Sequence, residues 1–164
     1  MGLAPDTENI DSGLEIAILE YDLSTKWAEH LRGNGLRITR QRVAVLAAIE
    51  RMPHCDALEI WNEIQAAMPS LSVQAVHVIV RDLAAAGLLR RIDLPETSSV
   101  RYETQTSDNH HHLQCVVCGW IEDVDCVIGE APCVEPSQTH GMKMLFAEVV
   151  FGGLCPECEE VGER

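Results

Sequence analysis

The sequence has few aromatic residues and no long apolar run. Aromatic side chains make up 4% of the 164 residues, so a core formed from the 46% that are hydrophobic must be mainly aliphatic. No apolar run approaches the ~18 residues that would span a membrane, and the N-terminus lacks the basic and apolar segments of a secretory signal. We therefore expect a cytoplasmic protein of one ordinary domain or two small ones.

Basic residues are also scarce, and their distribution is uneven. The chain has 12 Lys and Arg against 26 Asp and Glu, and its net charge of −14 argues against nucleic acid as a partner of the chain as a whole. Residues 26–92 nevertheless carry nine basic and six acidic side chains, whereas residues 93–164 carry three and fourteen. Because phosphate contacts need local positive charge, residues 26–92 stay a candidate for binding DNA.

The N-terminal residues differ in composition from the rest of the chain. Residues 1–22 contain six acids and no Lys or Arg. We predict an N-terminal extension over residues 1–24, with two alternatives for its state. Either residues 14–21 form a short helix or the whole segment is disordered.

Residues 25–104 are predicted to form a winged helix-turn-helix domain that binds DNA. Three helices are expected, and each follows a residue whose side chain can cap its first turn, namely Thr39, Asp56 and Ser72. Asp56 and Glu59 have the spacing of a capping box, and Gly87 is placed to end the third helix. Two β-prone segments come next, at residues 88–92 and 100–104, and complete the order of a winged helix.

Seven cysteines are a high count for a chain without a secretory signal, where paired cysteines more often serve metal or redox chemistry. Four of them form two Cys-x-x-Cys pairs, Cys115 with Cys118 and Cys155 with Cys158. Two such pairs supply the four thiolates that a structural zinc ion prefers, and nearby glycines allow the tight turns. The alternatives are two redox dithiols or ordinary buried cysteines. We predict a small zinc-binding α/β domain over residues 105–164.

Three consecutive histidines precede the first cysteine pair. In a β-strand, His110 and His112 face one side and His111 faces the other, so two imidazoles on one face form half of a second metal site. The alternative is an exposed polar patch.

Five segments together resemble the Fur family of metal-sensing repressors, over roughly residues 30–158. They are Gly-Leu-Arg-Ile-Thr-Arg-Gln-Arg (35–42), Pro-His-Cys-Asp (53–56), Ser-Val-Gln-Ala-Val (72–76), Asp-Asn-His-His-His-Leu-Gln-Cys-Val-Val-Cys-Gly (108–119) and Gly-Leu-Cys-Pro-Glu-Cys (153–158). The resemblance implies an α+β fold, with the winged helix followed by a dimerisation domain that holds a four-cysteine zinc site. It also implies a DNA-binding homodimer that recognises a palindrome, with no membrane partner and no enzymatic activity.

The resemblance further implies a regulatory metal site, with His54, Glu103, His110, His112 and Asp123 as its ligands. Nitrogen and carboxylate ligands suit Fe(II) or Mn(II) and also accept Zn(II) or Ni(II). Taken singly, His54 reads equally as a loop residue, and Glu103 and Asp123 read as solvated strand residues.

Asp123 indicates a branch of the family. In the peroxide-sensing branch, an aspartate at this position accompanies Fe(II)-catalysed oxidation of ligand histidines, here His54 and His110. Segments 123–126 and 129–133 resemble an actinobacterial branch that represses catalase-type genes. A regulator of iron, zinc or nickel availability is the alternative within the family, and a thiol redox protein is the alternative outside it.

Cys126 and Cys133 lie outside the quartet. They are either small buried hydrophobic residues or a reversible disulfide, and only geometry separates the two readings.

The predicted third helix presents residues suited to reading bases. Gln pairs with adenine, and Arg pairs with guanine or phosphate. The candidate DNA contacts are Gln74, His77 and Arg81 on this helix and Arg37 before the first helix. The family commonly has Tyr and a polar or basic residue where this chain has His77 and Val78, so the operator is not specified. Arg81 and Arg37 also read as ordinary surface charges.

Overall fold

The computed structural model describes residues 23–94, 99–106, 110–125, 138–143 and 149–162. The chain divides into two compact units. The first takes in the chain through Ile92 together with Arg101–Thr106, and the second takes in Asp93–Val100 together with the chain from Ser107. Among the described helices, none has the length and apolar character needed to cross a membrane.

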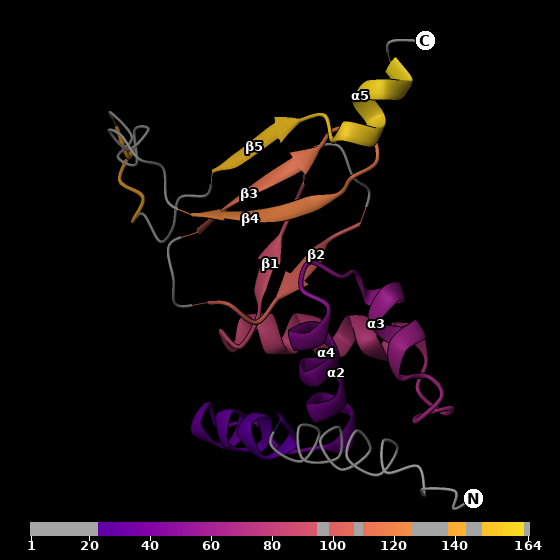
Figure 1. Ribbon diagram of the computed structural model, residues 1–164. Coiled ribbons are helices and arrows are strands. Elements are labelled where there is room, and N and C mark those ends of the chain that lie inside the picture. The colour runs from indigo at the N-terminus through magenta and orange to yellow at the C-terminus, as the bar shows by residue number, and fades with distance from the viewer. Residues whose placement is uncertain (1–22, 95–98, 107–109, 126–137, 144–148, 163–164) are drawn as a thin grey trace, which may run out of the picture. The chain divides into compact units, whose positions relative to one another are not determined.

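Three capped helices form most of the first unit, namely α2 (Arg40–Arg51), α3 (Ala57–Ile64) and α4 (Val73–Ala85) (Figure 1). The predicted caps Thr39, Asp56 and Ser72 are confirmed, because each side chain accepts a backbone N–H of its helix. Asp56 and Glu59 form both hydrogen bonds of a capping box. Gly87 follows α4 at φ 73°, a left-handed conformation that glycine adopts without strain.

The first described residues form a helix that was not predicted from the sequence. Residues 23–33 are helical up to Gly33. Trp27 and Leu31 are buried, and the Trp27 indole Nε1 donates to Glu50 Oε2 at 2.6 Å. Leu23, Trp27 and Leu31 recur every four residues, which is the spacing of one helix face. The helix runs across the predicted boundary at residue 24.

Helix α3 ends at Ile64, and Trp61 in its last turn is half-buried. The indole Nε1 of Trp61 donates to the backbone oxygen of Leu71 at 2.7 Å. The tryptophan thus secures the segment that leads into α4 instead of filling the core.

The core of the first unit is aliphatic, as the low aromatic content predicts. Each helix buries one face, with Val45, Leu46, Ala48 and Ile49 from α2, Ala57, Ile60 and Ile64 from α3, and Val76, Val80 and Leu83 from α4. These side chains leave the opposite face of α4 in solvent, and that face carries the predicted DNA contacts.

A short antiparallel hairpin completes the first unit. It consists of β1 (Arg90–Ile92) and β2 (Arg101–Glu103), both shorter than the predicted segments. In its register Arg90 lies opposite Glu103, and Ile92 lies opposite Arg101. An isolated antiparallel bridge also joins Cys55 to Tyr102, so the loop before α3 lies against β2.

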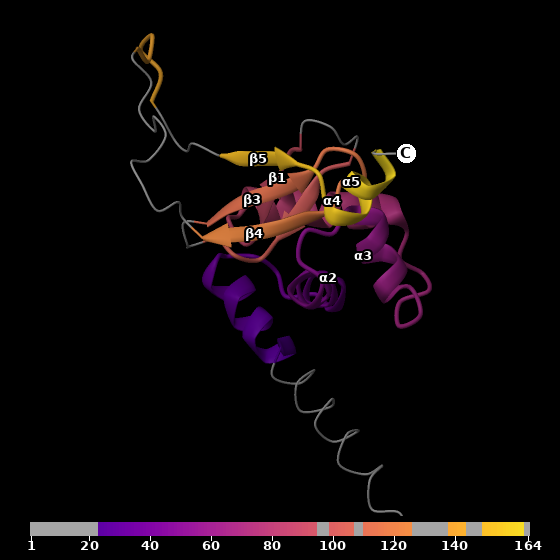
Figure 2. The same cartoon turned by 45° about the horizontal axis from the view of Figure 1, so that its top comes forward.

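The second unit contains a three-stranded sheet and a terminal helix, with strands β3 (His110–Cys115), β4 (Ile121–Asp125) and β5 (Val150–Gly153). Strand β3 lies in the middle, antiparallel to β4 and parallel to β5, as both views show (Figures 1 and 2). Helix α5 (Pro156–Gly162) follows β5 and was not predicted. Cys126 and Cys133 lie outside the described residues.

Candidate metal centres and nucleic-acid interface

The four predicted zinc ligands come together in the second unit. The sulfur atoms of Cys115, Cys118, Cys155 and Cys158 all lie within 4.8 Å of one another. The Cys118 and Cys155 sulfur atoms are 3.7 Å apart. Sulfur atoms bound to zinc at about 2.3 Å in a tetrahedron lie about 3.8 Å apart, whereas disulfide sulfur atoms lie about 2.05 Å apart. The spacing therefore fits a tetrahedral ion and excludes a Cys118–Cys155 disulfide.

Backbone turns at the end of β3 shape this cysteine cluster. Gly119 has φ 76°, and its N–H donates to Cys115 O at 2.9 Å, which closes the turn between the first two cysteines. Val116 N donates to Gly153 O at 2.9 Å. A Cβ at Gly152 would lie 3.2 Å from Val116 Cγ1, so the glycine allows β5 to pass close to the turn.

The cluster favours a bound cation. Backbone N–H groups of Cys118, Cys155 and Val117 hydrogen-bond the Cys115 sulfur and lower its pKa to about 6. By contrast, the hydrogen bond with the Cys155 side chain and burial raise the pKa of Cys158 to about 12. Close thiols resist simultaneous ionisation, and a divalent ion among them removes that resistance. The cluster thus fits zinc better than a set of free thiols.

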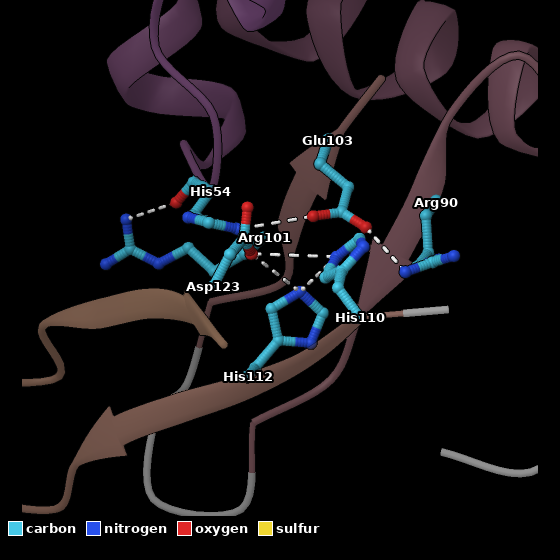
Figure 3. Close-up of polar contacts among 7 residues, drawn as sticks. All are labelled: His54, Arg90, Arg101, Glu103, His110, His112 and Asp123. Carbon is cyan, nitrogen blue, oxygen red and sulfur yellow. Dashed lines mark hydrogen bonds and ion pairs between the residues drawn. The ribbon is translucent and has the colours of Figure 1, made fainter. Parts of the chain in front are cut away.

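Two predicted regulatory ligands meet within the first unit. His54 Nε2 lies 3.2 Å from Glu103 Oε2, and the other carboxylate oxygen of Glu103 lies 3.0 Å from the Arg90 guanidinium (Figure 3). Glu103 is fully buried, and His54 is 8% exposed. A charge of this kind stays in a protein interior only when it is paired or binds a metal.

The backbone at His54 is held in an uncommon conformation. Its φ of 61° lies in the left-handed region that non-glycine residues seldom adopt. His54 N donates to Tyr102 O at 3.0 Å, and the Arg101 guanidinium donates to His54 O at 3.1 Å and to Glu59 Oε2 at 2.6 Å. These contacts fix the direction of the imidazole. Conformations of this kind are more often found at functional sites than elsewhere.

The other three predicted regulatory ligands meet within the second unit. The Nε2 atoms of His110 and His112 are 3.3 Å apart, and Asp123 Oδ1 lies 3.6 and 3.5 Å from them (Figure 3). Asp123 lies opposite His112 in the sheet register. Ligand atoms bound at about 2.1 Å in a tetrahedron lie about 3.4 Å apart, so these three atoms have the spacing of metal ligands.

The predicted alternation of the three histidines is confirmed. His110 and His112 point to one side of β3, and their rings meet edge to face at a centroid distance of 4.9 Å. His111 instead meets the ring of Phe151, at 6.0 Å.

The candidate DNA contacts lie in solvent. Gln74, His77 and Arg81 are exposed on one face of α4, where Val78 is 47% exposed. Arg81 lies 3.6 Å from Asp82 in an exposed pair, which is a weak interaction that phosphate can replace. Arg37 is also exposed and precedes α2.

Arg42 links the Arg37 segment to α4 and was not predicted from the sequence. Its guanidinium donates to Arg37 O at 3.0 Å and lies 3.7 Å from Asp82 Oδ2. One side chain thus contacts both elements that carry candidate DNA contacts.

Comparison with known proteins shows relatives over most of the chain. The model of the ferric uptake regulator family matches residues 33–151. The transcriptional regulator FurA of Mycobacterium tuberculosis is 48% identical over 132 residues, which cover 80% of this chain and 89% of that protein. The peroxide operon regulator of Bacillus subtilis is 33% identical over 135 residues, 80% of this chain and 90% of that protein. The ferric uptake regulator of Helicobacter pylori shares the fold, with a TM-score of 0.62 at 20% identity over 85% of this chain and 93% of that one.

Proposed function

This chain belongs to the ferric uptake regulator family of metal-dependent transcriptional regulators, and from this premise we propose that it is a repressor that senses peroxide. It binds DNA when a regulatory metal ion is present and releases DNA after oxidation of the histidines that hold the ion. Its targets are oxidative-stress genes of the catalase type.

The observation that carries the proposal is the position of Asp123 beside His110 and His112. Its carboxylate oxygen lies 3.5–3.6 Å from both imidazole nitrogens. The peroxide-sensing branch that the sequence resembles has an aspartate at this position. A relative at 33% identity is a peroxide operon regulator, which agrees with the same branch.

The regulatory site takes ligands from both units. His54 and Glu103 are its ligands from the first unit, and His110, His112 and Asp123 are those from the second. Three nitrogen and two carboxylate ligands suit Fe(II) or Mn(II), and zinc and nickel also bind such sets. An ion that needs all five ligands favours one arrangement of the two units, so its concentration controls the population that fits DNA.

Fe(II), if held by His54, Glu103, His110, His112 and Asp123, would supply the redox chemistry that splits peroxide next to the imidazoles. In the overall reaction, one oxygen atom of H₂O₂ is added to an imidazole carbon of His54 or His110, and the other leaves as water. The ring loses two electrons and the O–O bond gains them. The oxidised ring would be a poorer ligand, which would weaken the hold of the site on the ion.

The second site is structural. We assign zinc to Cys115, Cys118, Cys155 and Cys158, which hold the end of β3 and the start of α5. With four thiolates the ion has no open position for substrate, which argues against an enzyme. A cytoplasmic dimer would then present two copies of α4 to a palindromic operator, with Gln74, His77 and Arg81 in the major groove and Arg37 near the minor groove.

Mass spectrometry tests the proposed sensing chemistry. The full chain is loaded with Fe(II) or Mn(II) and exposed to H₂O₂, and its peptides are compared. We expect one added oxygen on His54 or His110 with Fe(II) only, together with loss of binding to DNA of its own promoter region. Oxidation confined to cysteines would support a thiol redox protein instead.

A regulator of metal availability is the second candidate, because the same ligands bind iron, zinc or nickel without redox chemistry. It predicts metal-dependent DNA binding that H₂O₂ leaves unchanged. Absence of a DNase footprint with metallated protein at low salt would overturn both candidates.

A further inference from the structure

Glu103 is the fully buried carboxylate among the proposed regulatory ligands, and its two oxygens contact different residues. Oε2 lies 3.2 Å from His54 Nε2, and Oε1 lies 3.0 Å from a guanidinium nitrogen of Arg90. The Arg90 side chain is 27% exposed, whereas that of Glu103 is 1% exposed. One end of this ion pair is thus anchored in the interior.

The hairpin register brings the two residues together. Arg90 and Glu103 lie directly opposite each other on β1 and β2, where cross-strand side chains are in contact range. Leu88 and Leu89, just before Arg90, are 6% and 3% exposed, so the segment that joins α4 to β1 is packed in the interior. The position of the guanidinium is therefore set by backbone pairing and packing.

We propose that Arg90 is a positioning residue of the regulatory metal site. Its guanidinium holds Oε1 of Glu103 and thereby presents Oε2, beside His54, to the ion. The inference rests on the proposed function, because it assumes that Glu103 is a ligand. It adds a residue that binds no metal and yet sets the affinity for metal.

Removal of the Arg90 guanidinium changes the affinity for the metal ion through two opposed interactions. The ion pair with Arg90 restricts the carboxylate to one orientation, and loss of such an outer partner typically weakens metal binding about 10–100-fold. The positive guanidinium also repels a cation, and removal of that repulsion would strengthen binding. We expect orientation to outweigh repulsion, because without the guanidinium the buried Glu103 side chain can take orientations in which Oε2 no longer faces the ion.

Titration of the zinc-loaded full chain with Mn(II) tests this inference. Electron paramagnetic resonance counts free Mn(II), and peroxide chemistry does not interfere. We expect Arg90→Met to weaken Mn(II) binding about 10–100-fold and Arg90→Lys to recover part of the loss. Arg91→Met is the matched control, because Arg91 is the next residue on β1, is exposed and lies opposite Tyr102; it should bind Mn(II) as the parent chain does.

Other measurements separate a positioning role from a loss of fold. Zinc content and far-UV circular dichroism should be the same in all four proteins, and if Arg90→Met fails this check, Arg90→Gln takes its place. An affinity of the folded variant equal to or tighter than that of the parent would overturn the inference. Absence of exchangeable Mn(II) binding in the parent chain would instead overturn the proposed function.

Discussion

The two units present the same kinds of metal ligand by different means. In the first unit, His54 and Glu103 come from a loop and a short strand, and arginine side chains hold them. In the second unit, His110, His112 and Asp123 come from adjacent strands, and the sheet register aligns them. The first arrangement depends on individual side-chain contacts, and the second depends on an intact sheet.

The two units also differ in what stabilises their folds. The first unit has a continuous aliphatic core formed by α2, α3 and α4. In the described part of the second unit, several large apolar side chains are exposed, including Val117 at 67% and Trp120 at 49%. A small unit with little buried apolar surface needs another source of stability, and a structural metal is one such source. We therefore expect the sheet of the second unit to depend on the cysteine cluster.

The largest effect should result from substitution of a zinc ligand. Cys115→Ser should abolish zinc binding and unfold the second unit, because structural zinc contributes about 10–16 kcal/mol to the folding of small zinc domains at neutral pH. Zinc content and near-UV circular dichroism measure the result. Cys55→Ala is the control, since Cys55 is a buried cysteine of the first unit outside the cluster, and it should keep its zinc. A Cys115→Ser protein with an intact sheet would show that the second unit does not depend on zinc for its fold.

A core substitution should affect the first unit alone. Leu46 on α2 is fully buried, and Leu46→Ala should lower the free energy of unfolding by about 2–5 kcal/mol through lost packing and a residual cavity. Urea unfolding followed by Trp fluorescence measures the change. Zinc content should stay unchanged, and Leu58→Ala should cost little because Leu58 is 53% exposed. Loss of zinc from Leu46→Ala would show that the stability of the second unit depends on the core of the first.

Loss of a helix cap should have a smaller effect, again in the first unit. Asp56 accepts N–H groups from Leu58 and Glu59 at 2.9 Å, so Asp56→Ala should cost about 1 kcal/mol of stability. Asp56→Asn keeps a hydrogen-bond acceptor at the cap and should therefore retain most of the stability that Asp56→Ala loses. Unfolding curves of the three proteins test this order, and equal stability of Asp56→Ala and the parent would contradict it.

The helical part of the fold was largely predictable from local sequence signals. Thr39, Asp56 and Ser72 cap their helices as predicted, because a cap needs only its own residue and the next three. The helix over residues 23–33 was not predicted, because a stripe of only three apolar residues in so short a segment is a weak signal. Helix α5 is short and acidic and carries no apolar periodicity that would have predicted it.

The sequence predicted which candidate side chains come near one another within each unit, but not the contacts that hold them. The pairing of Arg90 with Glu103 requires the hairpin register, which the turn residues alone do not specify. The left-handed φ of His54 depends on tertiary contacts with Tyr102 and Arg101. Long-range pairing of this kind leaves no pattern in a single sequence. The sharing of one ion by the two units and the predicted boundary at residue 104 stay predictions.

The smallest effect should come from His111, and it tests whether the sheet alone selects the ligands of the second unit. His111 lies on the opposite face of β3 from His110 and His112, against Phe151. His111→Ala should therefore leave Mn(II) affinity unchanged, whereas His112→Ala should abolish binding at the regulatory site because it removes a 1% exposed ligand. Both variants should keep zinc, since neither alters the cysteines. Equal losses of Mn(II) binding would mean that the strand acts as a whole, and that its alternation does not decide which histidines bind the ion.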